Sequence, residues 1–177
     1  ETSHYSNSDW EKYRENNIAM IFQDFNIIEN LTVVENVELA LLRIESSKER
    51  RKIADDLINR VGLTKQRNQK TSKLSGGEKQ RCVIARALAK DSPIILADEP
   101  TGNLDVKASK EIAALLKEVS KDKLVIVVTH NPEFFTMYST RRITILDGSV
   151  KFDNVIEQPQ KKDIKINNIH ISRKQNI

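Results

Sequence analysis

The sequence predicts an α/β fold: a parallel sheet, a helical subdomain inserted into that sheet, and a small C-terminal β-hairpin. Short apolar runs at residues 18–22, 94–97 and 124–128 alternate with helical patterns. The run at 124–128 is apolar at every position, which is typical of parallel strands buried on both faces. Between about residues 32 and 90 the patterns are helical only, so these helices interrupt the sheet rather than alternate with its strands.

In the first half of the chain, residues 18–22 form a predicted strand that ends at Gln23. Thr32 and Glu35 have the spacing of a capping box, which predicts a helix from there to about Arg43. Ser46 and Glu49 repeat this pattern before residues with helical apolar spacing, and Gly62 marks the stop of that helix.

A third box, Ser75-Gly76-Gly77-Glu78, opens a predicted helix that runs to about Lys90. Residues 94–97 then form a strand, and an amphipathic helix follows, marked by Ile112, Leu115, Leu116 and Val119. Residues 143–146 and 149–153 form a hairpin around Asp147-Gly148, a frequent two-residue turn. We therefore expect one domain over residues 1–158, with a sheet core at 1–23 and 92–158 and the helical subdomain at about 24–91.

Composition narrows the possible functions. The formal charge of +4 comes from residues 159–177, which carry five lysines and arginines against one aspartate. The charge-balanced remainder argues against a nucleic-acid partner. No apolar run approaches the ~20 residues of a membrane helix. The single cysteine, Cys82, is expected to be a buried apolar residue. Residues 159–177 are interpreted either as a free basic tail or as a linker toward a fused membrane domain.

The helix start at Ser75-Gly76-Gly77-Glu78 indicates phosphate binding as well as capping. Helix N-termini present free N–H groups and a positive dipole end to anions. A cap does not require two glycines, whereas a backbone that approaches a ligand closely does. We therefore expect Ser75, Gly76 and Gly77 to contact a phosphate.

Two adjacent carboxylates follow the apolar strand 94–97. Asp98 lies at its carboxyl end and is positioned to hold Mg²⁺, either directly or through water. Glu99 is one residue further and is positioned to orient and deprotonate an attacking water. This division between a metal ligand and a base suits phosphoryl transfer.

Two further polar residues follow strands and are expected at the same sheet edge, where α/β proteins bind ligands. His130 follows the strand 124–128 and could donate a hydrogen bond to a terminal phosphate oxygen. Gln23 follows the strand 18–22 and could contact the metal or the water through its amide. Asp105 is interpreted from its position alone as an N-cap of the next helix.

From about Tyr13 to Asp153 the chain resembles the nucleotide-binding domain of ABC (ATP-binding cassette) ATPases. Residues 74–81, LSGGEKQR, correspond to the signature motif, and residues 94–98 followed by Glu99 to the Walker B motif and catalytic base. Gln23 would start the Q-loop, residues 103–105 would form the D-loop, and His130 would be the switch histidine. The resemblance adds Glu78 and Asp105 to the residues expected to bind ATP. The segments DEPTGNLD (residues 98–105) and VTHNPE (residues 128–133) resemble those of the branch that exports lipoproteins, macrolides and antimicrobial peptides.

The chain departs from this family at its front. None of its five glycines is followed by the lysine that the P-loop requires. In the family that loop, and the first strand, precede the strand that ends at Gln23, and 22 residues are too few to hold them. We therefore expect the amino-terminal segment to have been cut away, and the chain alone to be inactive.

The resemblance implies ATP and Mg²⁺ as ligands, a second ABC ATPase domain in a head-to-tail dimer, and a membrane permease as partner. It implies a place on the cytoplasmic face of the membrane. It also suggests that residues 23–42 contact the permease, with Phe25, Ile27 and Ile28 exposed; the alternative is that these three side chains pack inside the subdomain. The alternatives for function are a non-transport ABC ATPase and an inactive fragment without the P-loop.

Overall fold

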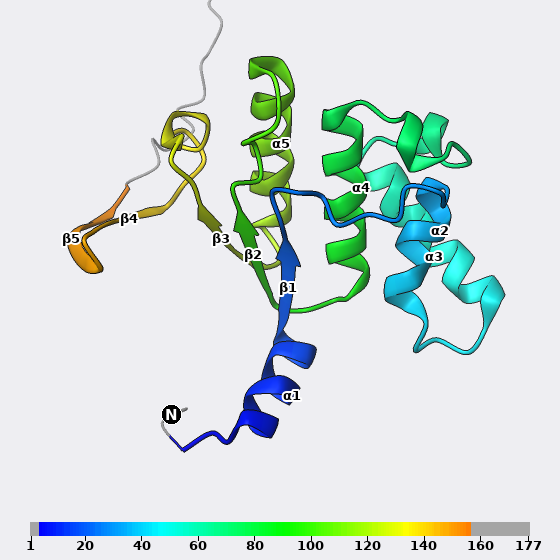
Figure 1. Ribbon diagram of the computed structural model, residues 1–177, viewed down its shortest axis with the longest axis horizontal. Helices are drawn as coiled ribbons and strands as arrows, with labels where there is room; N and C mark the ends of the chain where they lie inside the picture. The colour runs from blue at the N-terminus through cyan, green and yellow to red at the C-terminus, as the bar shows by residue number, and fades with distance from the viewer. Residues whose placement is uncertain (1–3, 157–177) are drawn as a thin grey trace, which may run out of the picture. The chain divides into compact units, whose positions relative to one another are not determined.

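The computed structural model describes residues 4–156 of the 177 (Figure 1). The chain divides into two compact units, one ending at Tyr138 and one beginning at Ser139. The predicted boundary between sheet core and helical subdomain stays a prediction. The basic segment 159–177 lies outside the described residues.

The first unit contains a three-stranded parallel sheet in the order β1-β2-β3. Its strands are β1 (Ile18–Ile21), β2 (Ile94–Asp98) and β3 (Leu124–Val128). The register pairs Ile21 with Ala97 and Asp98 with Val128, so the three carboxyl ends lie level at one edge. This sheet confirms the predicted parallel arrangement and brings the residues after each strand together.

One face of this sheet is open within the first unit. Ala19, Ile21, Ile95 and Ala97 on the other face are at most 1% exposed. The expectation that β3 is buried on both faces is wrong here, because Leu124, Ile126 and Val128 are 57%, 44% and 61% exposed. Within residues 4–138, packing elements cover only the face to which β3 contributes Val125 and Val127.

Helix α1 (Asn7–Asn17) precedes the sheet and was not predicted. Ser6 caps it: its Oγ accepts from the Asp9 N–H at 3.3 Å, and the Asp9 carboxylate accepts from the Ser6 N–H at 2.9 Å. None of its residues is buried, so it has no apolar periodicity from which a helix could be inferred. Tyr5, Trp10 and Tyr13 pack edge to face with ring centroids 5.3–6.1 Å apart.

The helical region contains α2 (Val33–Glu38), α3 (Ser47–Arg60) and short 3₁₀ turns η1 (Leu39–Leu41), η2 (Thr64–Gln66) and η3 (Thr71–Lys73). The predicted helix to Arg43 is too long, because the chain tightens into η1 after Glu38.

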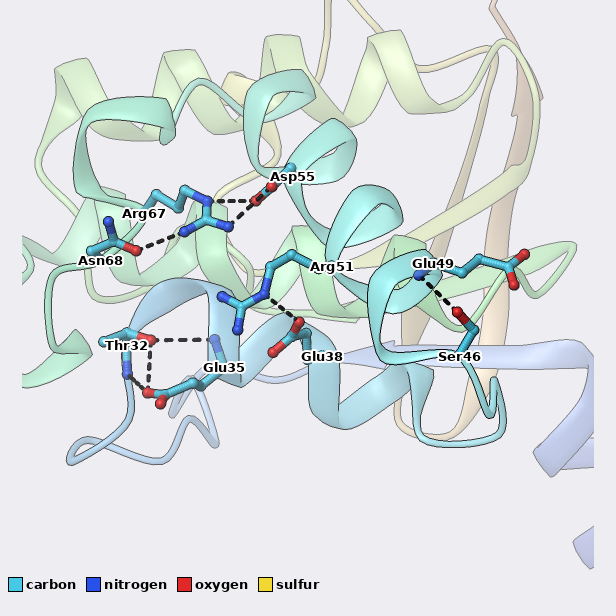
Figure 2. A network of polar contacts seen from close by, with 9 residues as sticks. All are labelled: Thr32, Glu35, Glu38, Ser46, Glu49, Arg51, Asp55, Arg67 and Asn68. Atoms are coloured by element: carbon cyan, nitrogen blue, oxygen red, sulfur yellow. Dashed lines mark hydrogen bonds and ion pairs between the residues drawn. The ribbon is translucent and has the colours of Figure 1, made fainter.

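Of the predicted capping boxes, that of α2 is complete: Thr32 N–H donates to the Glu35 carboxylate at 2.7 Å (Figure 2). At α3 only half forms, since Ser46 accepts from the Glu49 N–H at 3.3 Å and no return bond forms. Arg51 pairs with Glu38 at 2.8 Å across α2 and α3.

Helix α4 (Gly76–Ala89) is the centre of the packing. It contacts α2, α3, α5 and β1, and its buried residues include Cys82, Val83 and Ile84, each at most 1% exposed. The burial of Cys82 confirms the prediction of a buried core residue, and it raises the pKa of the thiol to about 11, which keeps it protonated. Helix α5 (Val106–Val119) packs its apolar stripe against the same core.

After α5 and β3, a 3₁₀ turn η4 (Pro132–Phe134) leads to the end of the first unit. The second unit is the predicted hairpin, β4 (Arg141–Leu146) and β5 (Ser149–Val155), paired antiparallel. Asp147 and Gly148 have φ of 48° and 70°, the left-handed pair of a tight hairpin turn. No helix among residues 4–156 is both long and apolar enough to cross a bilayer.

Candidate functional site

The carboxyl edge of the sheet gathers the predicted catalytic residues. Glu99 follows β2 directly, and its N–H donates to Val128 O at 2.9 Å, which fixes the turn against the end of β3. Its carboxylate then meets the residues after β3. Oε1 accepts from the His130 N–H at 2.7 Å and contacts His130 Nδ1 at 2.7 Å, while Oε2 accepts from Thr129 Oγ1 at 3.0 Å.

These contacts define the charge state of Glu99. Burial alone would raise the pKa of this carboxyl, but the hydrogen bonds from His130 and Thr129 outweigh burial and hold the pKa below its ordinary value. The group is therefore ionised at neutral pH. An ionised carboxylate only accepts hydrogen bonds, so the proton of the 2.7 Å contact resides on His130 Nδ1. The imidazole is 70% exposed, and its Nε2 has no hydrogen bond to any described residue.

Asp98 and Gln23 lie at the ends of the paired strands β2 and β1. Both are exposed at this edge. Their carboxylate and amide oxygens are the hard ligands that Mg²⁺ prefers, and Mg²⁺ usually takes few protein ligands and completes its shell with water and phosphate. Among residues 4–156 there is no cluster of three or more His, Cys, Asp or Glu that could hold a metal ion.

The loop of residues 101–105 (the 101–105 loop) joins the turn at Glu99 to α5. Gly102 N–H donates to Glu99 O at 3.0 Å, and Asn103 Nδ2 donates to Gln23 O at 3.2 Å. Asp105 caps α5, since its Oδ1 accepts from the Ala108 N–H at 2.8 Å. The N-cap interpretation of Asp105 is therefore confirmed, and its part in ATP binding stays a prediction.

The signature segment begins α4 with a complete capping box. Ser75 N–H and Oγ donate to the Glu78 carboxylate at 2.8 and 2.9 Å, and Glu78 also accepts from Gln66 at 2.8 Å. The hydrogen bond from the Ser75 backbone is the main reason that the pKa of Glu78 lies below its ordinary value. The N–H groups of Gly76 and Gly77 have no acceptor among the described residues, so they are free for an anion.

The two glycines also have a role in packing that the sequence did not reveal. A Cβ at Gly76 would lie 3.2 Å from Leu104 Cδ2, and one at Gly77 would lie 3.2 Å from Ala108 Cβ. The bare backbone of α4 thus allows close approach of the 101–105 loop and α5. Phosphate binding is therefore not the sole physical reason for two glycines at this helix start.

The structure brings Gln23, Asp98, Glu99 and His130 to one edge, as predicted. In Figure 1 the helix α4 begins on the side to which the strand arrows point. Within the described chain, however, no hydrogen bond or ion pair joins residues 75–78 to Asp98, Glu99 or His130. The 101–105 loop is the element that contacts both regions.

Sequence reasoning gave no role to Thr129 or Gly102, and it placed Asn103 in the predicted D-loop without its contact to Gln23. The only signal for Thr129 was a hydroxyl between an apolar strand and a histidine. Phe25 and Ile27 were expected to be exposed, but they are partly buried and pack against the core; Ile28 is 49% exposed.

A parallel sheet with an acidic pair and a polar residue after the neighbouring strand, next to a glycine-rich helix start, defines a nucleotide-binding α/β class. A family model described as "ABC transporter" matches residues 2–102, more than half of the chain. The chain belongs to this family.

Its relatives are ABC ATP-binding proteins. YvrO of Bacillus subtilis, an uncharacterised ABC transporter ATP-binding protein, is 42% identical over 79% of this chain and 62% of its own length. The macrolide export ATP-binding/permease protein MacB of Bartonella henselae is 37% identical over 92% of this chain and 25% of its own length. A dimeric structure of MJ0796 of Methanocaldococcus jannaschii, described as a post-hydrolysis state bound to ADP and Pi, superposes with a TM-score of 0.74. It is 39% identical and is matched over 88% of this chain and 70% of its own. The chain thus spans about three-fifths of the length of relatives such as YvrO.

Proposed function

We propose that these 177 residues belong to an ABC ATPase that binds and hydrolyses ATP to move a membrane permease. The observation that carries the proposal is the Glu99 carboxylate, held at the sheet edge by Thr129 and His130 directly after Asp98. Family membership and the dimeric, ADP-bound relative support it.

In this proposal Asp98 and Gln23 would hold Mg²⁺. When bound, this ion would neutralise charge on the phosphate oxygens. Glu99 orients the attacking water and accepts its proton, which is consistent with a carboxylate kept ionised by three donors. His130 uses Nδ1 for Glu99, so only Nε2 is left for a phosphate oxygen.

A second copy would complete the site. We place the free N–H groups of Gly76 and Gly77, with Ser75, against the terminal phosphate of the nucleotide bound to the partner domain in a head-to-tail dimer, with Glu78 and Asp105 supporting this interface. The dimeric MJ0796 structures support a dimer. The MacB relative, which is named as a macrolide export ATP-binding/permease protein, supports a membrane partner and an export role. We infer from family membership a place at the cytoplasmic face of the membrane. Residues 1–177 alone would not hydrolyse ATP, because no glycine in them is followed by the P-loop lysine.

The test is ATP hydrolysis by the complete protein that carries these residues. Glu99→Gln keeps size and hydrogen bonding but removes the base, so we expect turnover to fall by on the order of 10²-fold or more with ATP binding retained. Glu118→Gln, an exposed change on α5, is the matched control and leaves turnover unchanged. Full turnover in Glu99→Gln would refute the assignment of the base.

A further inference from the structure

The 101–105 loop is packed directly against Gln23. A Cβ at Gly102 would lie 2.9 Å from Gln23 Nε2 and 3.3 Å from Gln23 Cδ. Next to it, Asn103 Nδ2 donates to Gln23 O at 3.2 Å. Gly102 thus lies against the side-chain amide of Gln23, and Asn103 binds its backbone carbonyl.

We propose that Gly102 and Asn103 are positioning residues that place the Gln23 amide at the sheet edge. The Asn103 hydrogen bond fixes the backbone of Gln23, and the bare Cα of Gly102 sets how closely its amide approaches the turn that begins at Glu99. This inference rests on the proposed function, in which the Gln23 amide meets the metal or the water.

The ordinary explanation of a Gly-Asn pair is turn chemistry. It does not apply to Gly102, whose φ is not in the left-handed range. Alanine would therefore be allowed by the backbone at this position. What a side chain would meet is the flexible end of Gln23, so an added methyl displaces that amide at little cost in stability.

The loop is also held on its other side. A Cβ built at Gly76 would lie 3.5 Å from Asn103 O and 3.2 Å from Leu104 Cδ2, so the loop backbone already lies close to the start of α4. The Gly102 N–H is also bonded to Glu99 O at 3.0 Å. A substitution at Gly102 therefore moves Gln23 rather than the loop.

The experiment is a double-mutant cycle in the complete ATPase, with kcat, KM for ATP and Tm measured for wild type, Gly102→Ala, Gln23→Ala and the double variant. Displacement of a reacting group by about 1 Å costs on the order of 10²-fold in rate. We expect kcat of Gly102→Ala to fall by about tenfold or more, with KM changed less than about twofold and Tm within ~2 °C of wild type. In the Gln23→Ala background the same change has no further effect, because the group that it displaces is gone.

A second variant tests the backbone contact. Asn103→Asp is nearly isosteric but cannot donate to Gln23 O, and it lowers kcat, whereas Asn154→Asp on the hairpin does not. Wild-type kcat in both Gly102→Ala and Asn103→Asp, or independent losses that multiply in the double variant, would overturn the inference. These results leave the role of Glu99 untouched, because loss of turnover in Glu99→Gln tests the proposed function separately.

Discussion

Gly77 gives the sharpest test of how α4 packs on α5. Gly77→Ala adds one methyl whose carbon would lie 3.2 Å from Ala108 Cβ, inside the ~3.5–4.0 Å of an optimal carbon contact. Ala108 is a short side chain fixed to the first turn of α5, so it cannot rotate away and the helices must separate. Overpacking of this kind costs about 1–3 kcal/mol, against a helix-propensity gain of ~1 kcal/mol for Gly→Ala.

Gly76→Ala is the matched control, because it meets the terminal methyl of Leu104, which can change rotamer. We expect Gly77→Ala to be less stable than Gly76→Ala by about 1–2 kcal/mol, which for a protein of this size is ~2–8 °C in Tm. The assay is nucleotide-free thermal unfolding of the complete protein, so that ATP contacts do not contribute. Equal Tm values for the two variants, or a Gly77→Ala protein more stable than Gly76→Ala, would show that close helix packing is not what excludes a side chain there.

The other predictions concern closure, pH and the permease surface. With ATP, we expect Glu99→Gln to elute as a dimer in size exclusion and Ser75→Arg to stay monomeric, because the added side chain occupies the phosphate position. The opposite result would contradict a nucleotide site that is shared between two copies. The folded-state pKa of Glu78 lies below its unfolded value, so the capping box stabilises the protein above the unfolded pKa, and this contribution is lost as pH falls through the folded pKa. Tm measured from neutral to acidic pH should therefore fall less steeply in Glu78→Gln. An equally steep fall in both proteins would show that the capping box does not contribute to this pH dependence. Ile28→Asp uncouples transport and leaves basal ATPase unchanged, whereas Phe25→Asp lowers Tm because that ring packs on the core; equal effects on Tm would place both side chains in the core.

The sequence was sufficient for features that depend on local pattern. The apolar runs identified all three parallel strands, and the spacing of Ser75 and Glu78 identified the start of α4. Helix α1 was missed because it buries none of its residues. The contact of Gly77 with Ala108 joins residues 31 positions apart, so no local pattern carries it. The same holds for the hydrogen bond from Thr129 to Glu99 and for the open face of β3, which depends on what else covers the sheet.

The backbone at Glu99 has a consequence for adaptation of this protein. With φ of 44°, Glu99 occupies the left-handed region, which costs a non-glycine residue ~1 kcal/mol or more and which glycine adopts freely. Glycine would relieve this strain, but Glu99→Gly would also remove the acceptor of three hydrogen bonds from Thr129 and His130, so it should abolish ATP turnover without raising Tm. The turn after β2 is thus a position where backbone strain is kept together with the carboxylate, and stabilised variants of this protein should be sought elsewhere in the chain.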